Sequence, residues 1–231
     1  MLGLTKDKSA ANTLRTLAAL LSYPNDEIRG YLPQMADVLR REAALSPARL
    51  AEIEALLRVL TRTDPLALEA DYVALFDRGR ATSLHLFEHV HGDSRERGPA
   101  MIDLAQTYEK AGLYLAEGEL PDYLPVVLEF VSTQPPREAR AFLSEMAHIF
   151  NAIFGALQSR HNAYASVLGA LLELADEKAQ PVKPAVEEPM DESWAEPVVF
   201  DGCSTKGQAK PGEVQPIHIV RKTHAAQGVA P

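Results

Sequence analysis

The chain has 231 residues, of which 46% are hydrophobic and 24% charged, and this length is enough for one domain with a substantial core. It carries 23 Lys and Arg against 32 Asp and Glu, and this formal charge of −9 excludes a general nucleic-acid-binding protein, which needs a basic surface for the phosphates. A single cysteine excludes an internal disulfide and any metal site built from several cysteines of one chain.

The sequence contains no segment that is apolar enough to cross a membrane. The longest stretch without Asp, Glu, Lys or Arg is 14 residues, from Met146 to Ser159, whereas a transmembrane helix needs about 20 predominantly apolar residues. The N-terminus also lacks the sustained apolar core of a secretory signal. We therefore expect a cytoplasmic protein without a membrane span.

The first third of the chain shows two helical patterns. The first has leucines at positions 14, 17 and 21, at helical spacing, after Ser9 as a candidate N-cap. The second begins at Ser46 and Pro47, which suit the N-cap and the first helical position, and continues as an apolar stripe over residues 50–60. Both patterns predict amphipathic helices with one buried face.

Two further helices are predicted between residues 64 and 115. Asp64 and Pro65 repeat the signal for an N-cap and a first helical position, and Gly79 is a suitable end for that helix. The next helix is expected to open near Pro99 and to run to about Leu115. The residues between them show the weakest helical pattern of the predicted core.

The strongest helical signals come in the last part of the predicted core. One helix is expected to start with Asp122 as its N-cap, and the stretch after the proline pair 135–136 carries two apolar stripes as far as Leu157. A final helix runs from about Asn162 to Ala175. Because no hairpin signal appears, the predicted fold class is all-α, a single-domain helical bundle of about seven to nine helices.

The composition changes near residue 178. Residues 1–177 hold 25 acidic and 17 basic residues, a charge of −8, whereas residues 178–231 hold seven of the 16 prolines and no repeating apolar stripe. Prolines remove backbone donors, and so little apolar surface cannot offset the entropy of ordering. We therefore predict an all-helical domain over residues 1–177 and a disordered, proline-rich C-terminal tail over residues 178–231.

The stretch from Arg80 to Gly98 is rich in chemically active side chains. His85, Glu88 and His89 form an H-x-x-E-H pattern, which on a helix would let both imidazoles hold a catalytic zinc ion with the glutamate as base. A catalytic zinc ion also needs a third protein ligand, and none follows clearly. The pattern is compatible with a zinc hydrolase, with histidines hydrogen-bonded at a helix end, or with a binding surface.

Three segments, taken together in their order along the chain, resemble a known family. They are DYVALF at 71–76, SLHLFEHVHGDSRERGPAMIDLAQTYEKAGL at 83–113 and LPDYLPVVLEF at 120–130. The sequence is similar here to the nitrate reductase molybdenum cofactor assembly chaperones of the NarJ type, within the wider group of all-helical redox-enzyme maturation chaperones. The resemblance covers most of residues 10–175, and WAEPVVF at 194–200 is similar to the tail of some members. Tyr123 stands where the wider group often has His after Pro-Asp, and this matches the nitrate reductase branch better.

The resemblance implies a cytoplasmic chaperone that is not an enzyme, has no catalytic residue and needs no cofactor or metal of its own. Its expected partner is the apo catalytic subunit of a respiratory nitrate reductase, bound chiefly through that subunit's N-terminal segment. Proteins that deliver the molybdenum cofactor are further candidate partners, and nucleic acid is not. The chaperone would keep the subunit competent for cofactor insertion, delay its attachment to the membrane and leave before the enzyme is complete.

A helical bundle typically binds a peptide in an apolar groove. We expect the helices that hold residues 72–76 and 122–130 to form the groove walls, with residues 85–91 at its lip. The negative charge of the domain suits a target segment that carries Lys or Arg. The candidate target-binding residues are Tyr72, Leu75, Phe76, His85, Glu88, His89, Asp93, Asp122, Tyr123 and Leu124.

Two other functions remain open from the sequence. A zinc hydrolase would use the H-x-x-E-H segment and would hold a stoichiometric metal ion. A helical adaptor would act mainly through its tail, in which Trp194 lies isolated among polar residues and Cys203 has no activating neighbour. Deleting the tail separates the adaptor from the chaperone, because the adaptor needs the tail for target binding and the chaperone does not.

Overall fold

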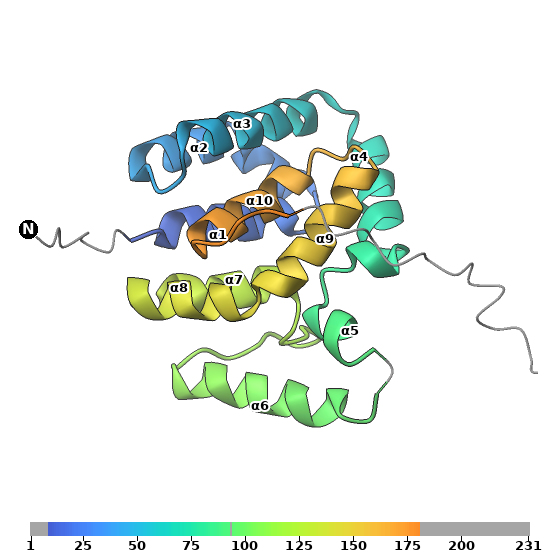
Figure 1. The fold of residues 1–231 in the computed structure, drawn as a ribbon. Helices are drawn as coiled ribbons and strands as arrows, with labels where there is room; N and C mark the ends of the chain where they lie inside the picture. The colour runs from blue at the N-terminus through green and yellow to red at the C-terminus, as the bar shows by residue number, and fades with distance from the viewer. Residues whose placement is uncertain (1–8, 93, 181–231) are drawn as a thin grey trace, which may run out of the picture. The chain divides into compact units, whose positions relative to one another are not determined.

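The computed structural model describes residues 9–92 and 94–180, and all of them belong to one compact unit. They form ten α-helices, a π-helical turn (η1) and a 3-10 helix (η2), and the predicted all-α class is confirmed. In chain order, the elements are α1 Ala11–Leu21, α2 Asp26–Glu42, α3 Pro47–Arg62, α4 Pro65–Tyr72, η1 Val73–Asp77, η2 Arg80–Thr82, α5 Leu86–Val90, α6 Arg97–Lys110, α7 Leu124–Thr133, α8 Pro136–Glu145, α9 Ala147–Ser159 and α10 Ala165–Leu174 (Figure 1).

Local sequence signals set the starts of α3 and α4. Ser46 Oγ accepts a hydrogen bond from Arg49 N at 3.3 Å, and Asp64 Oδ1 accepts from two backbone N–H groups of α4 at 3.1 and 3.2 Å. A proline occupies the first helical position of both helices, where its missing N–H costs nothing. Both predicted starts are confirmed.

The helix that begins at α4 continues through η1 and ends just before Gly79, as predicted. A Cβ atom at this buried glycine would collide with Thr82 Oγ1 and with the carbonyl oxygen of Leu75. Glycine is therefore required where the chain turns from η1 into η2.

Three helical segments differ from the sequence prediction. The sequence does not predict α2, because Pro33 interrupts its helical pattern. Three of its 17 residues are buried, Leu32, Met35 and Leu39, so its apolar stripe is short. The segment after the proline pair is two helices, since the backbone turns at Met146 (φ −90°, ψ −1°) between α8 and α9. The third is α5, which forms in the stretch with the weakest helical pattern. These additional elements explain why the described residues hold more helices than the expected seven to nine.

α1 and α10 lie at the centre of the bundle. α1 packs along α7 on one side and against α2 on another, and α10 packs against α3, α8 and α9 (Figure 1). Every residue from Val167 to Leu172 in α10 is buried, as are Phe150 and Ile153 of α9, which belong to the two apolar stripes predicted after the proline pair 135–136. This core supports the segments around α4, α5 and the start of α7, which carry the candidate site.

The boundary between domain and tail stays a prediction, because most of the predicted tail, with Trp194 and Cys203, lies outside the described residues. At the end of the described part, Gln180 N donates to Asn151 Oδ1 of α9 at 2.8 Å. Among the helices described, none is both long and apolar enough to cross a bilayer.

Candidate functional site

Two short segments from distant parts of the chain lie side by side in the candidate site. The residues just before α5 and those just before α7 form an isolated antiparallel bridge between His85 and Tyr123. Two backbone N–H groups, one from each segment, donate to carbonyl groups of the other segment at 3.0 and 2.9 Å. This pairing brings the candidates of α5 together with Asp122, Tyr123 and Leu124.

Asp122 is a fully buried carboxylate at the centre of this arrangement, with 0% of the residue exposed. Its Oδ2 accepts a hydrogen bond from Phe87 N at 3.1 Å, and its Oδ1 lies 3.4 Å from His85 Nδ1. Arg97 Nη2 is 3.8 Å from Oδ2. Such partners are needed, because burial of an unpaired carboxylate disfavours its charged form.

The prediction that Asp122 is the N-cap of α7 is wrong. α7 begins at Leu124, with Tyr123 at the N-cap position and no side-chain hydrogen bond there. The carboxylate of Asp122 instead caps the first turn of α5 by accepting from Phe87 N. It can do so because its segment pairs with the residues at the start of α5, a contact that local sequence does not reveal.

His85 precedes α5 with an extended backbone (φ −85°, ψ 104°) and a half-buried ring. The hydrogen bond from its side chain to Asp122 raises the pKa of the imidazole, and partial burial opposes this shift. We therefore assign Nδ1–H as the donor to the carboxylate. The ring packs on Tyr123, with 5.3 Å between the ring centroids.

The geometry that the H-x-x-E-H pattern requires for zinc is not present. Because α5 begins after His85, this residue and His89 do not lie one turn apart on a helix. His89 Nε2 lies 2.9 Å from the carbonyl oxygen of Ser83, while Glu88 pairs with Arg97. In the described ranges, no three His, Cys, Asp or Glu side chains are grouped to hold a metal ion. The zinc hydrolase interpretation therefore has no support in this part of the chain.

Glu88 is the candidate acid that solvent reaches. Its side chain is 31% exposed, and its Oε1 lies 3.5 Å from Arg97 Nη2. Since Arg97 also approaches the buried Asp122, one guanidinium group links the two carboxylates. Asp93, the third candidate acid, lies outside the described residues.

Tyr72 supports Tyr123 from the core. The Tyr72 hydroxyl donates to the carbonyl oxygen of Leu21 at 2.7 Å, and the two tyrosine oxygens are 2.9 Å apart. Burial raises the pKa of both phenols, so both remain protonated at neutral pH. This hydrogen bonding connects the end of α4 to the segment before α7.

Leu75, Phe76 and Leu124 are core residues, with 8%, 4% and 0% exposed, and Tyr72 is equally buried at 4%. Phe76 packs between the rings of Tyr72 and Tyr164, with centroid distances of 4.9 and 5.1 Å. These four candidates therefore lie behind the site instead of forming an open groove wall, and their part in binding stays a prediction.

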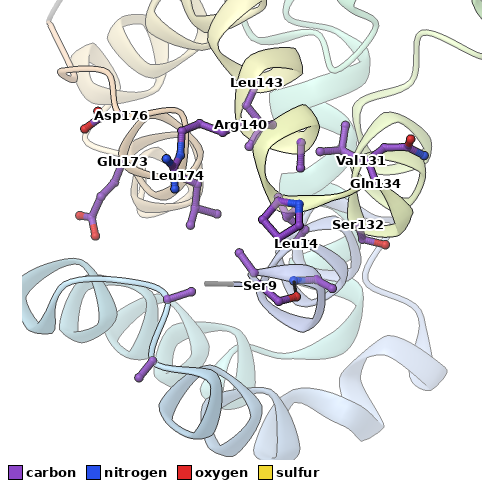
Figure 2. Close-up of a pocket in the computed structure, with 16 residues that line it drawn as sticks. Ser9, Leu14, Val131, Ser132, Gln134, Arg140, Leu143, Glu173, Leu174 and Asp176 are labelled. Atoms are coloured by element: carbon purple, nitrogen blue, oxygen red, sulfur yellow. Dashed lines mark hydrogen bonds between the residues drawn. The ribbon is translucent and has the colours of Figure 1, made fainter. Parts of the chain in front are cut away.

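A pocket of about 330 Å³ lies elsewhere, between the start of α1, the α2–α3 connection, α7, α8 and the end of α10 (Figure 2). Its lining combines apolar and charged side chains, among them Leu14, Val131, Leu143, Leu174, Arg140, Glu173 and Asp176. None of the described candidate residues lines this pocket. It is therefore separate from the candidate site.

Sequence patterns did not reveal two contacts of the site, those of Arg97 and of the Phe87 N–H group. Arg97 belongs to the alternating charges of residues 93–97, which are typical of a solvated loop. Its position beside Asp122 depends on how the chain folds back. The positive charge of Arg97 was therefore the one signal in the sequence that could have indicated this contact.

Comparison with known proteins places these residues in a family context. Residues 42–170, which contain every described candidate residue, match the model of a family described as nitrate reductase delta subunit. The chain is 42% identical over 160 residues to the nitrate reductase molybdenum cofactor assembly chaperone NarJ of Escherichia coli (strain K12), across 69% of this chain and 68% of that protein. It is 33% identical over 163 residues to a probable chaperone of the same name from Bacillus subtilis (strain 168), across 69% and 86% of the two chains.

A longer relative and a solved structure complete the comparison. The nitrate reductase-like protein NarX of Mycobacterium tuberculosis (strain CDC 1551 / Oshkosh) is 36% identical over 160 residues, and these residues make up 24% of that protein. A crystal structure from Archaeoglobus fulgidus, provisionally described as a redox enzyme maturation protein, has a TM-score of 0.54 at 20% identity. It covers 77% of this chain and 100% of that chain, which shows a shared fold.

Proposed function

Because the chain belongs to the nitrate reductase delta subunit family, we propose that it is an assembly chaperone for a respiratory nitrate reductase. It binds the apo catalytic subunit, chiefly through that subunit's N-terminal segment, and keeps it competent for insertion of the molybdenum cofactor. It acts in the cytoplasm by binding alone, delays membrane attachment and leaves before the enzyme is complete. The observation that carries this proposal is the 42% identity over 160 residues to a relative named for molybdenum cofactor assembly.

Target contact is assigned to the partly exposed side chains of the paired segments. His85, Glu88, His89 and Tyr123 all keep part of their surface accessible, and they come together at the bridge before α5 and α7. Glu88 supplies a carboxylate for a Lys or Arg of the target, which would replace Arg97 as its partner.

The buried candidates have a positioning role in this proposal. Asp122 holds His85 and the first turn of α5, and Tyr72 holds Tyr123 through their hydroxyl groups. Leu75, Phe76 and Leu124 support the same segments by packing. Asp93 is proposed as a further acid that contacts the target. The proteins that deliver the molybdenum cofactor are proposed as further partners.

Calorimetric titration of the full chain tests this function. The ligand is a synthetic peptide from the N-terminus of the cognate nitrate reductase catalytic subunit, and binding at micromolar affinity or tighter is expected. Glu88→Gln removes a charge without changing the shape of the side chain and should weaken binding about three- to tenfold. Glu145→Gln, at the exposed end of α8, is the matched control and should bind as the wild type does.

Two results would count against the proposal. If neither the peptide nor the whole apo subunit binds the wild-type chain, the chaperone function itself is wrong. If Glu88→Gln lowers the melting temperature as much as a core substitution does, the site assignment is wrong, because Glu88 would then be a structural residue.

A further inference from the structure

α6 and the loop that follows it are attached to the bundle at few points. Tyr108 is the buried residue of α6, its hydroxyl donates to the carbonyl oxygen of Pro121 at 2.8 Å, and its ring packs on Phe130 with centroids 4.7 Å apart. Ile102 is 59% exposed and Tyr114 80% exposed, so this part of the fold leaves apolar surface in contact with water. Figure 1 shows α6 at the edge of the helices, below α5 and α7.

A pocket of about 330 Å³ opens between the end of α6, the loop after it, α1 and α7. Tyr108, Val126 and Phe130 give it apolar walls, and the exposed ring of Tyr114 also lines it. We call this space the α6 pocket. Its volume is at the small end of ligand sites, which begin at about 300 Å³, so it admits a few side chains but not a whole helix.

The polar lining of the α6 pocket has more negative than positive charge. Glu119 and Glu129 both line it, and Arg15 is the cation among the lining residues. Partial burial raises the pKa of the Glu129 carboxyl, the negative charge of Glu119 raises it further, and Arg15 opposes both effects. Arg15 is also engaged elsewhere, since its Nε donates to Ser132 Oγ at 3.0 Å. A second cation at this rim would stabilise both carboxylates.

We propose that the α6 pocket is a docking site for a segment of the catalytic subunit in which an apolar side chain stands next to a Lys or Arg. This inference rests on the proposed chaperone function and adds a site that is distinct from the bridge between His85 and Tyr123. The apolar side chain enters between Tyr108, Val126 and Phe130, and the cation meets Glu119 and Glu129.

The position of the α6 pocket suits a peptide that also reaches the candidate site. The carbonyl group that Tyr108 holds belongs to Pro121, and the next residue is the buried Asp122. The pocket and the carboxylate cluster therefore flank one short segment of chain, residues 121–124. A target segment that lies along these residues would contact both the pocket and the candidate site.

A double-mutant cycle in the full chain tests the inference. One member is the Glu119→Gln/Glu129→Gln variant, and the other is the target peptide in which only the Lys or Arg beside the docking apolar side chain is replaced by Gln. Each change alone should weaken binding about tenfold, and the two together should weaken it no further, since both remove the same contact. The control variant is Glu27→Gln/Glu145→Gln, two exposed positions on α2 and α8, which should leave the affinity unchanged.

A photo-crosslinking amino acid in place of Tyr114 locates the peptide independently of stability. A crosslink from this position to the peptide supports the inference. If the Glu119→Gln/Glu129→Gln variant binds the peptide with wild-type affinity and position 114 gives no crosslink, the docking site is wrong and the chaperone function still stands. A crosslink between two copies of the chain would make the pocket a self-association surface and overturn the inference as well. Absence of binding by both the peptide and the whole apo subunit would instead overturn the proposed function.

Discussion

Asp122 connects three groups that lie well before it in the sequence. Its carboxylate accepts from Phe87 N, contacts His85 Nδ1 and lies near Arg97, which in turn pairs with the exposed Glu88. A buried carboxylate is stable only while such partners remain in place. The positions of His85 and Glu88, which are proposed to touch the target, therefore depend on one residue that the target does not reach.

The His85–Asp122 contact predicts a pH dependence of stability. The hydrogen bond to Asp122 raises the pKa of His85 in the folded chain above the ordinary value of about 6.5. The stabilisation by protonated His85 is therefore complete below about pH 6.5 and is lost as the pH rises through the folded-state pKa. In urea titrations, the stability advantage of the wild type over His85→Gln should be larger at pH 5.5 than at pH 8.5.

The control for this prediction is His148→Gln on the exposed side of α9, where Nδ1 of His148 lies 3.1 Å from the carbonyl oxygen of Glu145. This variant should follow the pH dependence of the wild type. A difference between the wild type and His85→Gln that stays constant or grows toward pH 8.5 would contradict the assigned contact.

At the scale of single elements, α5 has five residues and is too short to be stable by itself. It exists because Asp122 caps its first turn and because the bridge to Tyr123 fixes its start. The starts of α3 and α4 could be predicted, since Ser46 and Asp64 cap the helix that follows them directly in the chain. Asp122 carries the same chemical signal, and its place just before α7 predicted that it caps α7. It instead caps α5, a helix from another part of the chain.

α9 provides the test of the predicted core. Phe150 is 0% exposed, so Phe150→Ala should lower the free energy of unfolding by about 3–5 kcal/mol, because it leaves a cavity that the surrounding helices only partly fill. Val59 of α3 is 51% exposed, so Val59→Ala should change the free energy of unfolding by less than about 0.5 kcal/mol. Denaturant unfolding followed by circular dichroism measures both, and equal effects would mean that α9 does not occupy the core.

At the scale of the whole molecule, the described residues end where the chain still contacts α9. Gln180 N is bonded to Asn151 Oδ1, and Ala179 packs against the core. The predicted tail has 7 acidic and 6 basic residues, so it adds little to the charge of −8 that residues 1–177 carry. If the domain attracts a basic target segment through its field, it does so largely without the tail.

A truncation after Gln180 tests the role of the tail. Because this end point retains the contact with Asn151, the melting temperature should stay close to that of the full chain. If the protein is a chaperone, the truncated chain should largely retain its affinity for the catalytic-subunit peptide, as measured by calorimetry. Complete loss of binding with an unchanged melting temperature would favour the adaptor that acts through its tail.

The sequence by itself determined the all-α class, most helix positions and the family, because apolar periodicity, caps such as Asp64 and the order of the motif segments are local properties of the chain. Tertiary structure alone decided which helix Asp122 caps and that His85 faces this carboxylate and not a metal-binding partner. The physical reason is that a buried polar group is stable only when partners neutralise its charge or satisfy its hydrogen bonds. Those partners are brought to it by the packing of segments that lie far apart in the chain.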